Sequence, residues 1–382
     1  MTDSEKVRTH YELAPYPSRD PADEKKRLIT GSPSHLLEVN HYLFKGARDF
    51  SKPFRALIAG GGTGDAAIMV AQQLADRGQK GEVIYLDLSG PSRKIAEERA
   101  KVRELKNITF LTASLLDVEE LGIGPFDYID CCGVLHHLPD PKAGLAALKS
   151  VLGPGGGVGL MLYGALGRRG IYETQAMLQQ LCGQEPINDR IDLARRLLKA
   201  LPDTNWLKRN PFLGDHKIGD AELADLLLHP LDRAYKVPEI LDLAASAQLK
   251  LVSFIAPVRY RPETYIKDPT LLKNLEALSD EVLAAFAEGL AGNMKTHSFY
   301  LTSSRHDTVA RPDGENAIPH LLTQSGKDLA KGVQERLAMK VDLAGLQVSF
   351  PLPVLAPAIL RQVDGEKDLR AIYETMALIN SN

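Results

Sequence analysis

Cysteine is scarce in this sequence of 382 residues, which contains only Cys131, Cys132 and Cys182. No Cys-x-x-Cys pair is present, and two adjacent cysteines with a distant third make a poor disulfide framework. We therefore expect a reducing compartment, no metal site built on cysteine, and packing roles for Cys131 and Cys132.

Long apolar runs are also missing, and neither sign of charge is in large excess. No stretch approaches the length of a membrane span, and the N-terminal "MTDSEKVRTHYELAPYPSRDP" lacks the apolar centre of a signal peptide. The 46 basic and 49 acidic residues give a net charge of -3, which provides no bulk attraction to nucleic acid or membranes. We predict a cytoplasmic protein of two or three domains, without internal repeats or low-complexity tracts.

Short apolar runs alternate with amphipathic stretches from Arg55 to Tyr163. A helix pattern and a strand pattern follow again at 237–255, and a last apolar run lies at Thr296–Ser304. Strands that alternate with helices predict a doubly wound, mostly parallel α/β sheet of the Rossmann-like type. Ser89 is expected to cap the helix after the second strand, with Pro91 in its first turn.

Changes in pattern divide the chain into five predicted parts. They are an N-terminal lid segment (1–50), a cofactor-binding core (51–164), a helical insertion on the substrate side (165–236), the remainder of the fold (237–305), and a linker with a small C-terminal domain (306–382). The tail pattern predicts a helix, a strand and a helix–turn–helix pair, in an α+β or winged-helix-like domain. Arg370 is the only basic residue of the second helix of that pair, which disfavours DNA binding and favours a dimer or partner contact.

The segment "FRALIAGGGTGD" places Gly60, Gly61, Gly62 and Gly64 between the first strand and its helix. Such a turn lets the backbone approach a ligand closely, and two cofactor classes use it. The dinucleotide pattern G-x-G-x-x-G fails at Asp65 when it starts at Gly60, and it fits weakly when it starts one residue earlier. S-adenosylmethionine (SAM) has no phosphate and carries an ammonium and a cationic sulfur, so it suits an acidic loop better.

Polar residues also follow the second and third strands. Asp87 closes the second strand, where a carboxylate can accept hydrogen bonds from both hydroxyls of a ribose. Ser114 and Leu115 come after the third strand, where they would border an adenine. These positions suit either cofactor class.

Four segments in order, "LIAGGGTGD", "YLDLS", "FDYIDCCGVLHHLPDP" and "LKSVLGPGGGVGLMLY", resemble the successive motifs of class I SAM-dependent methyltransferases. The resemblance covers about residues 54–163, with weaker support at 237–255. "YELAPYPS" and "LLLHPLDRAYKVPE" further resemble bacterial methyltransferases that carry a methyltransferase regulatory region, some of which modify protein lysines. The resemblance implies an enzyme that transfers a methyl group in line from SAM to a protein or peptide side chain or to a small metabolite.

The resemblance also implies a set of cofactor contacts. Asp87 would bind the ribose hydroxyls and Leu88 would pack on the adenine, while Ser114 stands where many relatives have an aspartate that faces the adenine amino group. The residues expected around the methionine part are Ala59, Gly60, Gly61, Gly62, Gly64, Cys132 and Gly133. Tyr16 is expected near the sulfonium through cation–π attraction, and the alternative is that Tyr11 and Tyr16 are lid rings that dock on the core.

An amine or hydroxyl nucleophile has to lose a proton, so the acceptor side is expected to hold a base. The candidates are His137, His216, His229 and Asp232, and Arg233 would grip a carboxylate or pair with Asp232. His136 and His137 are adjacent, and no cysteine or carboxylate follows at ligand spacing, so no metal site is expected.

Two other functions stay open on the sequence. The segment after the predicted fold suits partners, so the chain is alternatively a regulatory protein that binds SAM without catalysis. An NAD-dependent oxidoreductase is the weaker alternative. The sequence does not identify the methyl acceptor, and it leaves open whether the chain is a homodimer.

Overall fold

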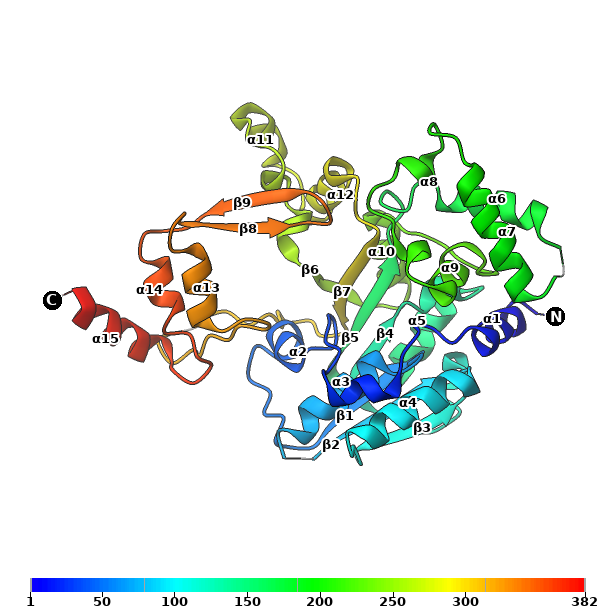
Figure 1. Cartoon of the computed structure of the whole chain (residues 1–382). Coiled ribbons are helices and arrows are strands. Elements are labelled where there is room, and N and C mark those ends of the chain that lie inside the picture. The colour runs from blue at the N-terminus through cyan, green and yellow to red at the C-terminus, as the bar shows by residue number, and fades with distance from the viewer. Residues whose placement is uncertain (1, 79, 184, 313, 381–382) are drawn as a thin grey trace.

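A sheet of seven strands forms the centre of the computed structural model, which describes residues 2–78, 80–183, 185–312 and 314–380. The strands are β1 (Phe54–Ala59), β2 (Gly81–Asp87), β3 (Ile108–Thr112), β4 (Phe126–Cys132), β5 (Leu152–Tyr163), β6 (Lys250–Ile255) and β7 (Thr296–Thr302). Their order across the sheet is β3-β2-β1-β4-β5-β7-β6 (Figure 1). Neighbouring strands from β3 to β5 are parallel, and β7 is antiparallel to both of its neighbours. The predicted mostly parallel α/β fold is therefore confirmed.

Helices cover both faces of the sheet, which explains why its strands are nearly continuous apolar runs rather than alternating ones. One apolar core joins the sheet to α2 (Leu36–Leu43), α3 (Asp65–Ala75) and α4 (Gly90–Val102). The other core joins the opposite face to α5 (Pro141–Ser150), α10 (Val237–Ser246) and α12 (Asp280–Ala291).

Local capping signals place the helices that leave the carboxyl edge of the sheet. Ser89 caps α4, since its Oγ accepts the N–H of Ser92, and Pro91 lies in the first turn, as the sequence predicts. Gly64 precedes α3 with a φ of 104°, a left-handed conformation that favours glycine. The chain can therefore turn sharply from β1 into α3.

Further helices surround this core. They are α1 (Asp3–Leu13), α6 (Ile171–Leu181), α7 (Ile187–Ala200), α8 (Trp206–Arg209), α9 (Asp220–Leu227), α11 (Pro269–Leu275), α13 (Gly326–Val333), α14 (Ala356–Leu360) and α15 (Leu369–Asn380). Short 3-10 helices lie at Pro21–Lys25, Leu115–Asp117, Leu135–His137, Asp215–Lys217, Pro257–Tyr260 and Pro262–Thr264. Helices α6, α7 and α9 share an apolar core of their own and form the helical insertion expected after the fifth strand. Within the described ranges, no helix combines the length and the apolar character that crossing a bilayer requires.

The C-terminal elements are a hairpin of β8 (Ala338–Asp342) and β9 (Gln347–Pro351) together with α13, α14 and α15. Figure 1 shows them gathered at one side of the molecule, with the C-terminus at its margin. The hairpin turn docks on the main body, because Asn293 Nδ2 donates to the carbonyls of Leu343 (2.7 Å) and Ala344 (3.0 Å). The sequence predicted the helices and one strand here, and β9 is an additional strand.

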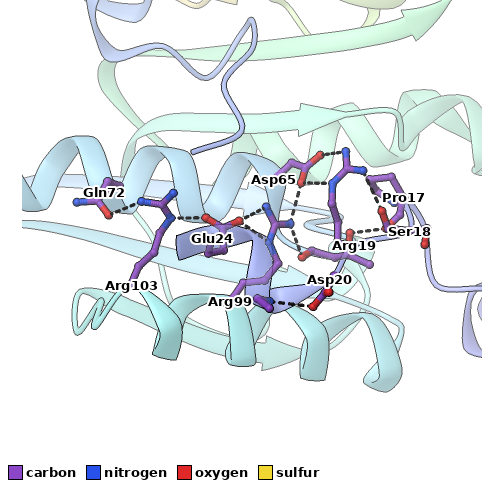
Figure 2. A network of polar contacts seen from close by, with 11 residues as sticks. Pro17, Ser18, Arg19, Asp20, Glu24, Asp65, Gln72, Arg99 and Arg103 are labelled. Carbon is purple, nitrogen blue, oxygen red and sulfur yellow. Dashed lines mark hydrogen bonds and ion pairs between the residues drawn. The ribbon is translucent and has the colours of Figure 1, made fainter. Parts of the chain in front are cut away.

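A buried ion-pair network fastens the segment between α1 and α2, residues 14–35, which we call the N-terminal strap (Figure 2). Arg99 of α4 is only 1% exposed and donates to Glu24 of the strap (2.8 Å) and to Asp65 at the start of α3 (2.7 Å). Arg19 of the strap donates to the other oxygen of Asp65 (2.6 Å), and Arg103 pairs with Glu24. The network joins the strap, α3 and α4 through a single buried guanidinium.

Replacement of Arg99 by methionine would leave the buried Glu24 and the partly buried Asp65 without their shared cation. We expect Arg99→Met to lower the free energy of unfolding by about 1–3 kcal/mol, because Glu24 and Asp65 each lose a charged donor, although Arg103 and Arg19 still pair with them. Chemical denaturation measures the loss, and Lys101→Met is the matched control on the exposed face of the same helix. Equal stability of the two variants would contradict a structural role for the network.

Candidate functional site

A cavity of about 550 Å³ opens at the carboxyl edge of the sheet, over the ends of β1, β2 and β4. Strand order reverses between β1 and β4, and open α/β sheets bind ligands in the crevice at such a switch point. Most of the predicted cofactor residues line it, namely Tyr16, Gly60, Gly61, Gly62, Asp87, Leu88, Ser114, Leu115, Cys132 and Gly133. Ala59 and Gly64 lie just outside the lining, since Ala59 is buried in the sheet core and Gly64 packs on α4.

The glycines are required mainly because other parts of the protein come close to them. A Cβ on Gly60, which has a φ of 75°, would lie 2.3 Å from Val134 Cγ2, and one on Gly61 would lie 2.3 Å from the ring of Tyr85. A Cβ on Gly62 would lie 2.8 Å from the carbonyl oxygen of Tyr16 in the strap. The loop is therefore wedged between β2, the loop after β4 and the strap, and it presents bare backbone to the cavity.

Asp87 connects the end of β2 to the glycine loop. Its Oδ2 accepts the N–H of Gly62 (2.7 Å) and its Oδ1 accepts the N–H of Ser89 (2.8 Å). Burial raises the pKa of the Asp87 carboxyl, and these two backbone hydrogen bonds oppose the rise. Each oxygen has a second lone pair, so the carboxylate can still accept two hydroxyls from the cavity.

Ser114 lies just after β3 and lines the cavity. Its Oγ accepts the N–H of Leu116 and caps the short helix that follows, Leu115–Asp117. The hydroxyl proton is left to donate into the cavity, which Ser114 lines.

His137 and His229 stack with ring centroids 3.8 Å apart, and Leu231 fixes both tautomers. The carbonyl of Leu231 can only accept, so His137 Nδ1 (2.8 Å away) carries its proton, and the neutral ring keeps a lone pair on Nε2. The N–H of Leu231 donates to His229 Nδ1 (3.1 Å), so neutral His229 carries its proton on Nε2. His137 lines the cavity and His229 lies behind it. Of the two, His137 alone presents a basic nitrogen.

Asp225 of α9 is a cavity residue that the sequence did not reveal. Its two oxygens accept the hydroxyls of Tyr11 and Tyr163, each at 3.1 Å. Burial raises the pKa of Asp225, and the neighbouring His137 opposes that rise. In "DAELADLL" the pattern gives Asp225 no feature that distinguishes it from other polar residues of a helix. Its place in the cavity wall follows from the contacts of α9 with Tyr163 of β5 and Tyr11 of α1.

The other predicted catalytic residues lie outside the cavity lining. Asp232 holds Arg168, whose guanidinium lines the cavity and lies 3.6 Å from the ring centre of Tyr163. Arg233 is exposed and pairs with Glu239, so the expected alternative pairing with Asp232 is wrong, because Arg168 occupies that carboxylate. His216 is half-buried beside the site, and its neighbour Asp215 reaches the lining instead.

Three buried side chains near the cavity have the composition of a metal site. Ligand-capable atoms of His10, Asp225 and His229 lie within 4.8 Å of one another. The buried Nε2 of His229 has no hydrogen-bond partner among the described residues, but it carries a proton while Nδ1 accepts from Leu231. A protonated nitrogen is not a metal ligand, so this arrangement is not set for metal binding.

The strand order and the cavity define the Rossmann-like fold of class I methyltransferases. Residues 57–158 match the family described as a methyltransferase domain. The chain is 17% identical to PKMT2 from Rickettsia typhi, solved in complex with AdoHcy, with a TM-score of 0.57 over 73% of this chain and 54% of that one. At this identity the likeness shows the fold alone.

Two sequence relatives match parts of the chain. An uncharacterized protein of Synechococcus sp. is 32% identical over 233 residues, which cover 59% of this chain and 54% of the relative. The tRNA 5-carboxymethoxyuridine methyltransferase of Escherichia coli K12 is 38% identical over 114 residues, 30% of this chain and 41% of the relative. The chain thus spans about half the length of these proteins, or less.

A pair of glycine variants tests the close approach at the loop. Gly60 and Gly155 have nearly the same φ, 75° and 73°, but a Cβ on Gly155 meets nothing within 4 Å. We expect Gly155→Ala to cost about 1–2 kcal/mol for its left-handed backbone, and Gly60→Ala about 1–3 kcal/mol more for the clash with Val134. Denaturant unfolding measures both. Equal losses of stability in the two variants would show that the space beside Gly60 can accept a side chain.

Proposed function

We propose that this chain binds SAM in the cavity and transfers its methyl group to an acceptor that enters beside His137. The match of residues 57–158 to a methyltransferase domain carries the proposal. Further support comes from the cavity of about 550 Å³, a size usual for cofactor sites, and from the glycine loop and Asp87 at its edge. The AdoHcy complex of the structurally similar PKMT2 agrees with a ligand of this kind.

The chemistry of the walls fits the parts of the proposed ligand. Asp87 has lone pairs left for the ribose hydroxyls, and Leu88 and Leu115 offer apolar surface to the adenine. Ser114 can donate to a ring nitrogen of the base. Gly60, Gly61, Gly62, Cys132 and Gly133 would border the methionine part, with Tyr16 over the sulfonium.

Bound SAM would supply a methyl group on a sulfonium, which is already a good leaving group. The protein then has to align the acceptor and keep water out. His137 Nε2 would accept the proton that the acceptor loses, while Leu231 keeps the other ring nitrogen protonated. Asp225, Tyr11 and Tyr163 would line the acceptor side.

We expect the acceptor to be a protein or peptide side chain or a small metabolite. Tritiated SAM added with the protein to a bacterial lysate would label the acceptor, and separation into protein, nucleic-acid and small-molecule fractions would give its class. Label in RNA would point to an acceptor of the kind named for the Escherichia coli relative. Bound SAM with no labelled acceptor would favour a regulatory protein without catalysis.

Replacement of Asp87 tests the cofactor site. We expect Asp87→Ala to weaken SAM binding more than tenfold, because hydrogen bonds to a charged group contribute about 1.5–3 kcal/mol. Isothermal titration calorimetry gives the affinity. Glu82→Ala, at the opposite end of the same strand, is the control and should bind normally. Unchanged affinity of Asp87→Ala would refute this placement of the ribose.

Replacement of His137 separates catalysis from cofactor binding. We expect His137→Asn to lower the methylation rate of the labelled acceptor by about 10²–10⁴-fold, the usual contribution of a general base. SAM affinity should change little, since no cofactor contact is assigned to this ring. His216→Asn, which lies outside the cavity lining, should keep the normal rate. A normal rate for His137→Asn would exclude it as the base.

A further inference from the structure

Asp130 is a buried carboxylate in the cavity wall that neither the motifs nor the proposed chemistry uses. It lies on β4 in register with Ile58 of β1, is 1% exposed, and lines the end of the cavity next to residues 29–34 of the strap. Its Oδ2 accepts the hydroxyls of Ser34 (2.7 Å) and Tyr128 (3.1 Å). The Tyr128 hydroxyl also lies 2.8 Å from the Pro33 carbonyl, so Ser34 is the firmer donor.

Asp130 differs from Asp65, Asp215 and Asp225 of the cavity lining in what balances its charge, whereas Asp87 resembles it: among the described residues Asp87 has no ion pair either, but each of its oxygens accepts a backbone N–H. Asp65 has two arginines, and Asp215 lies 3.5 Å from Lys295. Asp225 accepts a hydroxyl on each of its oxygens. In the described part of the chain, Asp130 has no ion pair with a basic side chain, and both of its side-chain hydrogen bonds fall on Oδ2.

The charge state of this group favours a cationic partner. Burial raises the pKa of Asp130 to about 6, against the opposing hydrogen bonds from Ser34 and Tyr128. The carboxylate is therefore largely ionised at neutral pH, and a buried anion without a cation is costly. A ligand that brings a positive charge to this end of the cavity would relieve that cost.

The strand order places this carboxylate relative to the proposed cofactor. Asp87 and Ser114 follow β2 and β3, on one side of β1, and Asp130 belongs to β4 on the other side. An adenosine held at Asp87 would direct the amino-acid part of the cofactor across the β1 glycine loop toward β4. That part carries an ammonium group.

We infer that Asp130 is the counter-ion of the cofactor's ammonium group, with Ser34 of the strap orienting its carboxylate. The inference rests on the proposed function, because it requires a cofactor of this chemistry in the cavity. It gives the strap a direct part in cofactor binding, since a displaced strap would remove Ser34 from Asp130.

Three ligands and one conservative variant test this assignment. SAM and S-adenosylhomocysteine both carry the ammonium, SAM alone carries the sulfonium, and 5′-methylthioadenosine carries neither. We expect Asp130→Asn to weaken the binding of SAM and of S-adenosylhomocysteine at least about tenfold, because a charge-assisted hydrogen bond is lost. Calorimetry measures both affinities. Binding of 5′-methylthioadenosine should stay within about twofold. Asp127→Asn, on the same strand but outside the cavity lining, is the control and should bind all three normally.

Each other outcome would contradict this role of Asp130 in a different way. A loss for SAM alone would assign Asp130 to the sulfonium, and an equal loss for all three ligands would make it a support of the whole cavity. Unchanged affinity of Asp130→Asn for all three ligands would show that Asp130 does not contribute to cofactor binding. If the unaltered protein binds none of the ligands, the proposed function itself fails.

A measurement on the unaltered protein avoids any folding defect of the variant. In a crystal grown with S-adenosylhomocysteine, the ammonium nitrogen should lie within hydrogen-bond distance of an Asp130 oxygen. An ammonium nitrogen bound elsewhere in the cavity would refute the inference.

Discussion

The buried guanidinium of Arg99 is the interaction on which the arrangement of the site depends. It bonds Glu24 of the N-terminal strap and Asp65 at the start of α3, and it also donates to the Thr63 carbonyl in the glycine loop (2.8 Å). Burying this ion costs desolvation free energy. Its hydrogen bonds to Glu24, Asp65 and the Thr63 carbonyl offset that cost. The strap, the glycine loop and α4 are thereby held as one unit at the cavity edge.

Backbone contacts between the strap and the loop complete this unit. The N–H of Thr63 donates to the Tyr16 carbonyl (3.3 Å), and its hydroxyl donates to the Pro17 carbonyl (2.7 Å). Farther along, the strap brings Ser34 to Asp130 on β4. One segment outside the sheet therefore contacts both the loop after β1 and the carboxylate of the neighbouring strand, so its position controls the shape of the cavity.

A second set of constraints lies at the cavity wall that contains His137, where Leu231 sets the tautomers of two histidines. Leu231 offers one donor and one acceptor, and His137 and His229 take up opposite tautomers in response. Asp232 supports the same region indirectly by holding Arg168 against Tyr163. The chemistry of this wall is therefore decided by groups that do not themselves reach the cavity.

The order of elements was predictable because it depends on local patterns. Apolar runs, amphipathic stretches and capping residues such as Ser89 identified the parallel α/β core, and the residues after β1, β2 and β4 marked the cavity edge. Strand ends of a parallel sheet meet at one edge whatever lies between them in the chain. The motif residues Gly60, Asp87 and Cys132 therefore came together as expected.

The partners of side chains far apart in sequence were decided only by tertiary structure. The pairing of Tyr11 with Asp225 spans 214 positions and that of Ser34 with Asp130 spans 96, and no periodicity encodes either contact. Arg168 rather than Arg233 pairs with Asp232, although Arg233 is adjacent in the chain. The sequence by itself determined the fold class and the motif positions, because local propensity and strand polarity suffice for them. Packing alone decided which polar groups are buried, which are paired and which face the cavity.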